Sequence, residues 1–354
     1  MKRARIIGFI MLTAFGQALA GNPERAGQAG GTQLLINSWG RSSGYNGINI
    51  ANTGGIESVI VNPAGIATTR RTELVFANTQ YLVGTDIQVN SFGLSQSLKK
   101  AGVVGVYVTA FDLGEFIITT EDNPDGDLGT FSPTFLNIGM SYAKQFTDNI
   151  YVGATIKAVH ESIADVGSTG IAFDAGVQYR TSFGKDDEHD DKLKLGISLR
   201  NIGSTMRYGG DGLTFRANRS EDFTSLAARP SADFELPSVL ALGVSYDIYF
   251  ADDLRFTPTG SFTSNAFSYD QIGVGFEAAY KQYFMLRYGY QYEQNINAPV
   301  LRTTAWTGHA FGATVEVPFK AGKDRGTSSF GLDYSYRTTD PFGGTHVLGV
   351  RIDL

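Results

Sequence analysis

The pattern most suggestive of catalysis is Gly40-Arg41-Ser42-Ser43-Gly44, which matches the G-x-S-x-G motif of serine hydrolases. In that motif the serine stands on a sharp turn between a strand and a helix, and a histidine paired with an acid activates it. No strand-like sequence precedes Gly40. We therefore predict that Ser42 is not a catalytic nucleophile.

Residues that could bind a metal ion are scattered along the chain. The four histidines show neither i, i+4 nor HExxH spacing; they are His160, His189, His309 and His346. The acidic turn 186–191 could hold a divalent cation weakly, although a solvated turn is the simpler interpretation. Residues 121–127 partly resemble a calcium loop, but Pro124 stands where a side-chain ligand belongs and Pro133 replaces the closing glutamate. We predict neither a metal site nor a bound cofactor.

Other chemistry is excluded by composition. Cysteine is absent, so disulfides and thiolate metal sites are impossible. A net charge of −6 argues against a nucleic-acid partner, because binding phosphates requires a basic surface. The chain also has no P-loop, no GxGxxG fingerprint and no paired catalytic carboxylates. The sequence therefore predicts a protein that is not an enzyme.

The first twenty residues have the pattern of a secretory signal peptide. Lys2, Arg3 and Arg5 precede a short apolar stretch at 6–15, and small residues at Ala18 and Ala20 mark a cleavage site. A membrane-spanning helix needs about 20 apolar residues, which this stretch does not reach, although an uncleaved N-terminal anchor is the alternative. We expect export through a cleaved signal peptide of residues 1–20.

The remaining sequence alternates between apolar and polar residues with a period of two. At 193–200, for example, leucines and isoleucine alternate with Lys194, Gly196, Ser198 and Arg200. Many such runs reach ten residues, which is long for a soluble strand and close to the 9–11 or so residues of a tilted membrane strand. Aromatic residues also lie near strand ends. The sequence predicts an all-β protein, a transmembrane antiparallel barrel of the outer membrane surrounded by lipid.

Counting these runs gives about fourteen strands between residues 72 and 354. They are 72–82, 85–97, 102–112, 135–146, 149–163, 168–182, 191–203, 236–250, 253–265, 269–281, 283–294, 305–319, 326–337 and 343–354. The longest connections, 113–134 and 204–235, follow odd strands, as expected for external loops, whereas connections after even strands are mostly short periplasmic turns. This arrangement places both chain ends in the periplasm. The polar faces would line a lumen containing Lys157, Arg200, Arg287, Glu316, Asp333 and Arg351.

Residues 21–71 show no strand pattern and are predicted to form an N-terminal periplasmic or plug segment. They contain Gly30-Gly31, Gly54-Gly55 and a turn motif, Asn62-Pro63-Ala64-Gly65. A disordered periplasmic tail is the alternative. The apolar residues of this segment argue against disorder; they include Ile48, Ile50, Ile56, Val59, Ile60 and Val61.

Several segments resemble a known group of proteins. The glycine- and alanine-rich stretch 46–55 followed by Asn62-Pro63-Ala64-Gly65 resembles the hatch of the FadL-like outer-membrane superfamily. Further segments resemble its PorV/PorQ-type branch; they are 119–132, 138–143, 199–203, 236–240, 286–290 and 331–346. The resemblance spans nearly the whole chain in order. Two departures leave the particular paralogue open, since Val347 stands where the branch often has arginine and Leu354 replaces a terminal aromatic residue.

The resemblance implies a fourteen-stranded FadL-like barrel with its N-terminal segment inside. It also implies a role in type IX protein secretion, in which PorV-like members associate with a large translocon barrel. Such members recognise the C-terminal signal domains of secreted cargo and pass the cargo to the surface attachment machinery.

Two functions of different classes remain open at this point. For secretion, apolar loop residues would contact partner proteins, or alternatively cover the barrel mouth; they are Phe116, Ile117, Phe131, Phe215, Phe223 and Phe234. The second function is transport of hydrophobic small molecules, in which Lys157 or Arg200 would capture a fatty-acid head group. The charged lumen favours secretion, because arginines facing acids there more often brace a barrel. A purely structural barrel whose plug never opens is a third interpretation.

Overall fold

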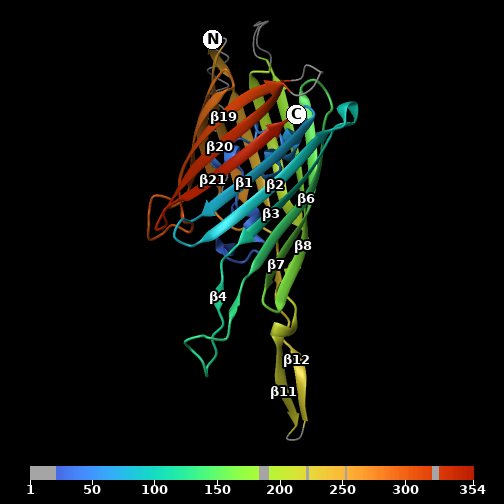
Figure 1. Cartoon of the computed structure of the whole chain (residues 1–354), viewed down its shortest axis with the longest axis vertical. Coiled ribbons are helices and arrows are strands. Elements are labelled where there is room, and N and C mark those ends of the chain that lie inside the picture. Colours follow the sequence, from blue (N-terminus) through green and yellow to red (C-terminus); the bar gives the residue numbers. More distant parts are fainter. Residues whose placement is uncertain (1–20, 183–190, 221–222, 252, 321–326) are drawn as a thin grey trace.

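The computed structural model describes residues 21–182, 191–220, 223–251, 253–320 and 327–354. Within these ranges, strands that follow one another around the barrel pair antiparallel, and β1 (Thr72–Tyr81) pairs with both β2 (Ile87–Ser97) and β21 (Thr345–Asp353). This last pairing closes a fourteen-stranded barrel (Figure 1). The predicted all-β barrel is therefore confirmed. The signal peptide expected at 1–20, His189 and most of the acidic turn 186–191 lie outside the described residues.

The remaining barrel strands begin and end close to the predicted runs. They are β3 (Val103–Asp112), β6 (Thr134–Gln145), β7 (Ile150–Ile163), β8 (Val166–Thr181), β9 (Leu193–Gly203), β14 (Val239–Tyr246), β16 (Leu254–Asn265), β17 (Gln271–Tyr280), β18 (Phe284–Glu293), β19 (Trp306–Lys320) and β20 (Thr327–Thr339). An extra short strand, β15 (Ile248–Ala251), continues β14 and pairs with β16. The prediction of one strand over 236–250 merged these two.

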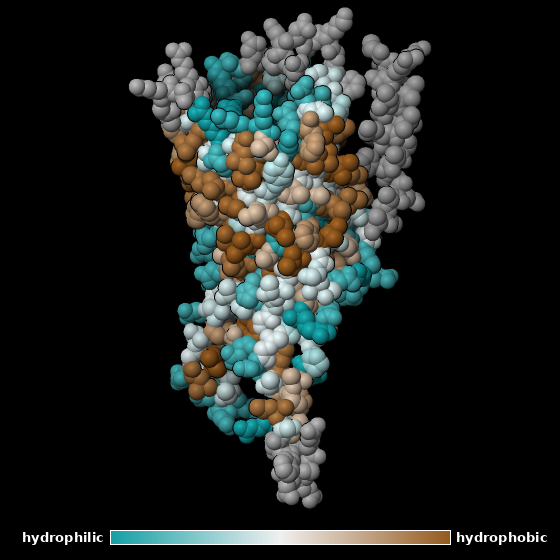
Figure 2. Space-filling view, turned by 90° about the vertical axis from the view of Figure 1, so that its right-hand side faces the viewer, coloured by the Kyte–Doolittle hydropathy of each residue, from teal (hydrophilic) through white to brown (hydrophobic). Residues whose placement is uncertain are grey.

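The barrel wall is inverted relative to a soluble protein. In β7, Thr155 and Lys157 are buried, whereas Ala154, Ile156 and Ala158 are exposed. The same alternation repeats around the wall, and Figure 2 shows a band of hydrophobic side chains on the outside of the barrel. An exposed apolar band of this kind suits contact with hydrocarbon, and a polar interior suits a lumen.

Aromatic and histidine side chains gather at the end of the wall that carries the long connections. Tyr288 and Tyr334 form hydrogen bonds, through their hydroxyls, to Nδ1 of His309 (2.9 Å) and His346 (2.8 Å) respectively. The rings of Tyr290 and His309 are 4.7 Å apart between centroids. Amphipathic rings of this kind are enriched where a barrel meets lipid head groups. These two histidines are thus part of an interfacial aromatic belt.

Residues 21–71 fill the inside of the barrel, where Figure 1 draws them in blue. They form short helical turns; these are η1 (Pro23–Arg25), η2 (Thr32–Leu35), α2 (Gly40–Ser43), η3 (Ile56–Ile60) and η4 (Pro63–Thr68). Trp39, Ile56 and Ile66 of this segment, which we call the plug, are fully buried against Val103 and Tyr107 of β3. The plug is therefore packed as a core and not as a loose tail. No helix in the described part of the chain is long and apolar enough to cross a membrane.

The plug runs through the barrel from one end to the other. At the end with the long connections, the Asn22 amide donates to the Asn265 carbonyl (3.3 Å) and the Gly30 amide donates to the Glu235 carbonyl (2.9 Å). At the opposite end, the Leu354 amide donates to the Thr72 carbonyl (2.9 Å). The expectation that both ends lie beside the short turns is thus wrong for the first described residues. The plug therefore enters beside the long connections and crosses the lumen to the start of β1 at the other end.

Two long connections extend from the barrel as hairpins. One contains β4 (Phe116–Ile117) paired with β5 (Thr130–Phe131), and the other contains β11 (Thr214–Ser220) paired with β12 (Phe223–Ala228). In the second connection β10 (Met206–Arg207) also pairs with β13 (Asp233–Phe234) at the base. Figure 1 shows both hairpins reaching away from the same end of the barrel, opposite the C-terminus.

Candidate functional site

The turn motif Asn62-Pro63-Ala64-Gly65 attaches the plug to the wall. Asn62 precedes η4, and its Oδ1 accepts a hydrogen bond from the Ala64 amide (3.1 Å), which caps the helical turn that Pro63 begins. The Asn62 Nδ2 donates to the Ile50 carbonyl (3.0 Å) and to the Val177 carbonyl of β8 (3.1 Å). One amide side chain therefore links two plug segments to a barrel strand.

Where the plug contacts the wall, several inward-facing strand positions are occupied by glycine. A Cβ added at Gly176 would overlap the Asn62 side chain, and one at Gly153 would overlap the Pro63 carbonyl. One added at Gly196 would lie 2.5 Å from the Ile50 carbonyl oxygen. The plug backbone can approach the strands this closely only because these wall positions lack side chains. The alternating glycines were visible in the sequence, but their common purpose was not.

An ion-pair cluster joins the plug to the last strands. Arg41 of α2 contacts Glu316 of β19 (Nη2 to Oε2, 2.9 Å) and Asp333 of β20 (Nε to Oδ1, 3.4 Å). Arg351 of β21 contacts the same two acids at 2.8 and 3.3 Å and also Asp353 at 3.1 Å. Of the six predicted lumen charges, three are thus brought together here, and Arg41 is the partner that sequence reasoning missed.

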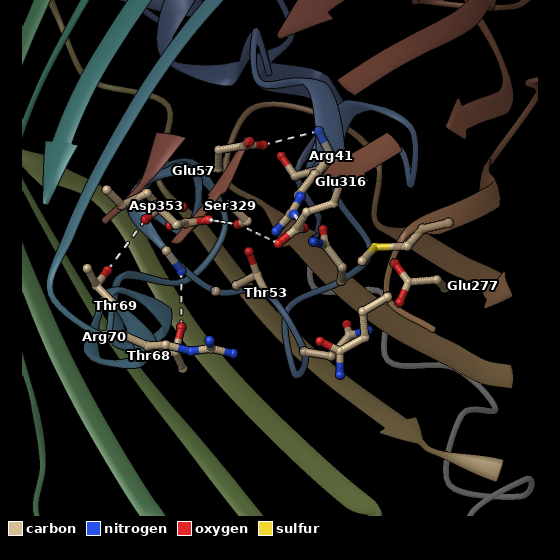
Figure 3. A pocket seen from close by; sticks show the side chains of 18 of the residues that line it. Arg41, Thr53, Glu57, Thr68, Thr69, Arg70, Glu277, Glu316, Ser329 and Asp353 are labelled. Atoms are coloured by element: carbon tan, nitrogen blue, oxygen red, sulfur yellow. Dashed lines mark hydrogen bonds and ion pairs between the residues drawn. The ribbon is translucent and has the colours of Figure 1, made fainter. Parts of the chain in front are cut away.

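Glu57 of η3 adjoins this cluster, and its Oε2 accepts a hydrogen bond from the Arg41 amide at 3.1 Å (Figure 3). Burial, assisted by the negative charge of Asp333, raises the pKa of the Glu57 carboxyl to about 8. The cluster thus places two arginines among four carboxyl groups, those of Glu57, Glu316, Asp333 and Asp353.

The other predicted lumen charges have separate partners. Lys157 of β7 is buried and contacts Asp174 of β8 (Nζ to Oδ2, 2.6 Å) and the Asn201 amide oxygen (2.6 Å). Arg287 of β18 contacts Glu277 of β17 at 2.7 Å. Arg200 of β9 donates through Nη1 to the carbonyl of Ile60 in the plug. The ion pairs involving Asp174 and Glu277 are between residues on adjacent strands, and the sequence alone did not indicate them.

Asp174 also stabilises an irregularity in the pairing of two barrel strands. Its Oδ1 accepts a hydrogen bond from the Asn201 backbone amide (2.7 Å), and Asn201 has a left-handed backbone with φ of 61°. The pairing of β8 with β9 shifts register at this point. The Asn201 side chain then donates to the Pro237 carbonyl at 2.9 Å. The buried Lys157–Asp174 pair therefore positions a β-bulge.

The G-x-S-x-G segment forms α2 of the plug, and its Ser42 hydroxyl is hydrogen-bonded to the Asn37 side chain at 3.0 Å. Ser42 is buried. This arrangement joins two plug segments.

The plug separates two cavities inside the barrel. The inner cavity, of about 310 Å³, lies toward the short turns, and Figure 3 shows the charged and polar side chains that line it, among them Arg41, Glu277 and Glu316. The outer cavity, of about 290 Å³, lies toward the long connections and is lined by residues that include Arg200 and Arg337. Both volumes are at the lower end of the range for small-molecule sites.

The predicted apolar contact residues divide into two groups. Phe234 packs edge-on against Tyr208, with ring centroids 5.9 Å apart, and its Cβ lies close to Gly30 of the plug, so it covers the barrel mouth. Phe116 stacks on Phe131 at 5.6 Å between centroids. In the two hairpins Ile117 is 63% exposed, Phe215 51% and Leu226 75%. Phe223 lies in β12.

Comparison with known proteins identifies solved structures that have a similar fold. No family model matches the sequence, and no curated protein matches it. Among solved structures, the CymD monoaromatic hydrocarbon channel has a TM-score of 0.51 at 15% identity, covering 90% of this chain and 97% of its own. The toluene transporter TbuX of Ralstonia pickettii has a TM-score of 0.50 at 14% identity, covering 95% and 98%. A FadL homologue of Pseudomonas aeruginosa has a TM-score of 0.48 at 12% identity, covering 90% and 97%.

The protein is thus a plugged β-barrel with a FadL-like fold, of the type found in Gram-negative outer membranes. The expected FadL-like fold is confirmed. None of the matching proteins named above is a PorV- or PorQ-type protein, so these similarities do not bear on the finer resemblance.

Proposed function

We propose that this chain is an outer-membrane component of protein secretion that binds partner proteins through its two external hairpins. The observation that carries this proposal is the exposure of Ile117, Phe215 and Leu226 on hairpins that extend beyond the barrel (Figures 1 and 2). These side chains lie outside the apolar band of the wall. Exposed apolar groups away from lipid are typical of protein-binding surfaces.

The interior of the barrel supports the same proposal. Both cavities are lined largely by polar or charged side chains, and the plug is fastened by Asn62 and Arg41 to opposite parts of the wall. This lumen suits a braced, closed barrel better than a path for apolar molecules. The sequence resemblance to PorV-type proteins suggests the partners, namely a large translocon barrel and the C-terminal domains of exported cargo.

A pull-down with a matched control tests this function. The chain would carry an affinity tag after residue 20 and be purified from its own membranes in mild detergent. We expect Phe116→Ser/Ile117→Ser to reduce the recovered translocon barrel or cargo domains at least tenfold. Val300→Ser is the control, because Val300 is 95% exposed on a different connection at the same end. Wild-type protein that purifies without either partner would refute the proposal.

A second candidate function is the passage of small molecules through the barrel. The fold similarity to the hydrocarbon channel CymD and the toluene transporter TbuX favours it. The plug would then have to move, because it separates the inner and outer cavities. Uptake of a radiolabelled aromatic hydrocarbon by proteoliposomes containing the barrel would support this function, whereas uptake equal to that of empty liposomes would exclude it for that compound.

A further inference from the structure

The outer cavity contains a buried arginine without an acidic partner. Arg337, at the outer end of β20, lines this cavity and is only 8% exposed. Its guanidinium lies over the Trp306 ring, 3.6 Å from the centroid. Within the part of the chain that the structure describes, the Arg337 side chain forms no hydrogen bond or ion pair, and its Nε is buried without a partner.

This arrangement differs from most other cations of the lumen. Lys157, Lys194 and Arg287 each contact a carboxylate within 2.7 Å. Arg41 and Arg351 share Glu316 and Asp333. A buried charge without a counter-ion is strongly unfavourable, and a ring face compensates for only part of the lost hydration. The unpaired Arg337 therefore needs an explanation other than bracing of the barrel.

The surroundings of Arg337 indicate what could pair with it. Arg200 lines the same cavity from the opposite wall, and its Nε is also buried without a partner. Glu293 is the acidic residue of the lining, and its Oε2 accepts a hydrogen bond from Gln271 at 2.8 Å. Two arginines and one glutamate leave the cavity with one excess positive charge. Apolar side chains complete the lining; they include Leu35, Ile60, Val61, Val239 and Ile296.

We propose that the outer cavity is a binding site for a small organic anion with a single carboxylate. The carboxylate pairs with the guanidinium of Arg337, which presents several N–H donors in one plane, and the apolar part of the ligand contacts the aliphatic side chains. The excess of one positive charge favours a monoanion over a dianion. A volume of about 290 Å³ limits the ligand to a compact molecule. This site is independent of the hairpin surface that carries the proposed function.

Three compounds that share one ring test the charge requirement. Benzoate is the monoanion, toluene is its uncharged counterpart, and phenyl phosphate carries more negative charge. Binding to the purified full-length barrel in detergent would be measured by calorimetry at low salt. We expect benzoate to bind, and phenyl phosphate and toluene to bind at least tenfold more weakly. Hydrogen bonds to charged groups contribute enough for a difference of this size.

A substitution and its control test the residue. Arg337→Gln should weaken benzoate binding at least tenfold and, because it removes an unpaired buried charge, should raise the melting temperature of the ligand-free protein. Arg180→Gln is the control, because Arg180 also faces a ring, that of Tyr151 at 4.5 Å, but does not line the outer cavity. Its benzoate affinity should be unchanged.

Four results would count against the proposal. Absence of benzoate binding at millimolar concentration, toluene binding as tight as benzoate, or equal affinity in Arg337→Gln and wild-type protein would each overturn the proposal. Tighter binding of phenyl phosphate than of benzoate would overturn the assignment to a monocarboxylate. None of these results would affect the pull-down test of the hairpins.

Discussion

Arg41 of the plug and Glu316 of β19 form an ion pair, with Nη2 and Oε2 2.9 Å apart, that joins the N-terminal segment to the far end of the barrel sequence. Arg351 of β21 approaches the same Glu316 oxygen from the wall at 2.8 Å. The acid is therefore shared between a cation of the plug and a cation of the barrel. This sharing makes the position of α2 dependent on strands that are synthesised last.

We predict that Arg41→Met loosens the plug. Both side chains of the Arg41–Glu316 pair are mostly buried, so removing the cation should reduce the free energy of unfolding by about 2 kcal/mol. Denaturant unfolding in detergent would measure this loss, and planar-bilayer recordings should show increased conductance. Arg25→Met is the control, because the Arg25–Glu235 pair at 3.0 Å is more exposed than the Arg41–Glu316 pair and should contribute about 0.5 kcal/mol. Equal effects of the two substitutions would contradict a specific role for Arg41.

Lys157→Met should be among the most destabilising substitutions in the wall. It leaves the Asp174 carboxylate buried without its counter-ion, which we expect to cost about 3 kcal/mol in unfolding free energy. The double variant Lys157→Met/Asp174→Asn should recover most of this loss, because an amide oxygen can still accept the Asn201 N–H at the bulge. Unfolding curves of the two variants and of exposed Lys281→Met, as a control, would test this pairing. A double variant no more stable than Lys157→Met would show that the charge pairing is not the cause.

Gly176→Ala should displace the plug. The new methyl group would overlap Asn62, which cannot move without losing its hydrogen bonds to Ile50 and Val177. Overpacking of this kind costs about 1–3 kcal/mol. Gly260→Ala in β16 is the matched control, because a Cβ there would meet Val244 at an ordinary 3.7 Å. Limited proteolysis of the plug should be faster in Gly176→Ala alone; cleavage at the wild-type rate would mean that the contact yields without displacing the plug.

Much of the barrel could be predicted from local sequence because strand geometry is local. Successive side chains point to opposite faces, so the period of two at 193–200 already separated the lipid-facing residues from Lys194 and Arg200. Long runs and the contrast between short and long connections then gave the strand number and the end that carries the hairpins. The inward direction of Lys157, Arg287, Glu316, Asp333 and Arg351 followed from the same alternation.

Contacts between residues far apart in the sequence could not be predicted from local alternation. The partner of Lys157 depends on the register between β7 and β8, and the partner of Glu316 depends on where the plug lies. Both chain ends were expected beside the short turns, but Asn22 and Gly30 lie beside the long connections, since no local pattern reports which end of a barrel a buried segment enters. The inward glycines are a similar case, because the absence of a side chain has meaning only when another backbone occupies the space.

The sequence by itself determined a long-stranded, inverted β-barrel with a buried N-terminal segment, because alternation and strand length are properties of neighbouring residues. Only the tertiary structure decided which of the lumen charges are paired. Closure of β1 onto β21 and threading of the plug bring acids to Arg41 and Arg351, whereas Arg337 lies beside Trp306 with no acidic partner among the described residues. Charge pairing depends on distances across the lumen, and those distances exist only once the barrel has closed.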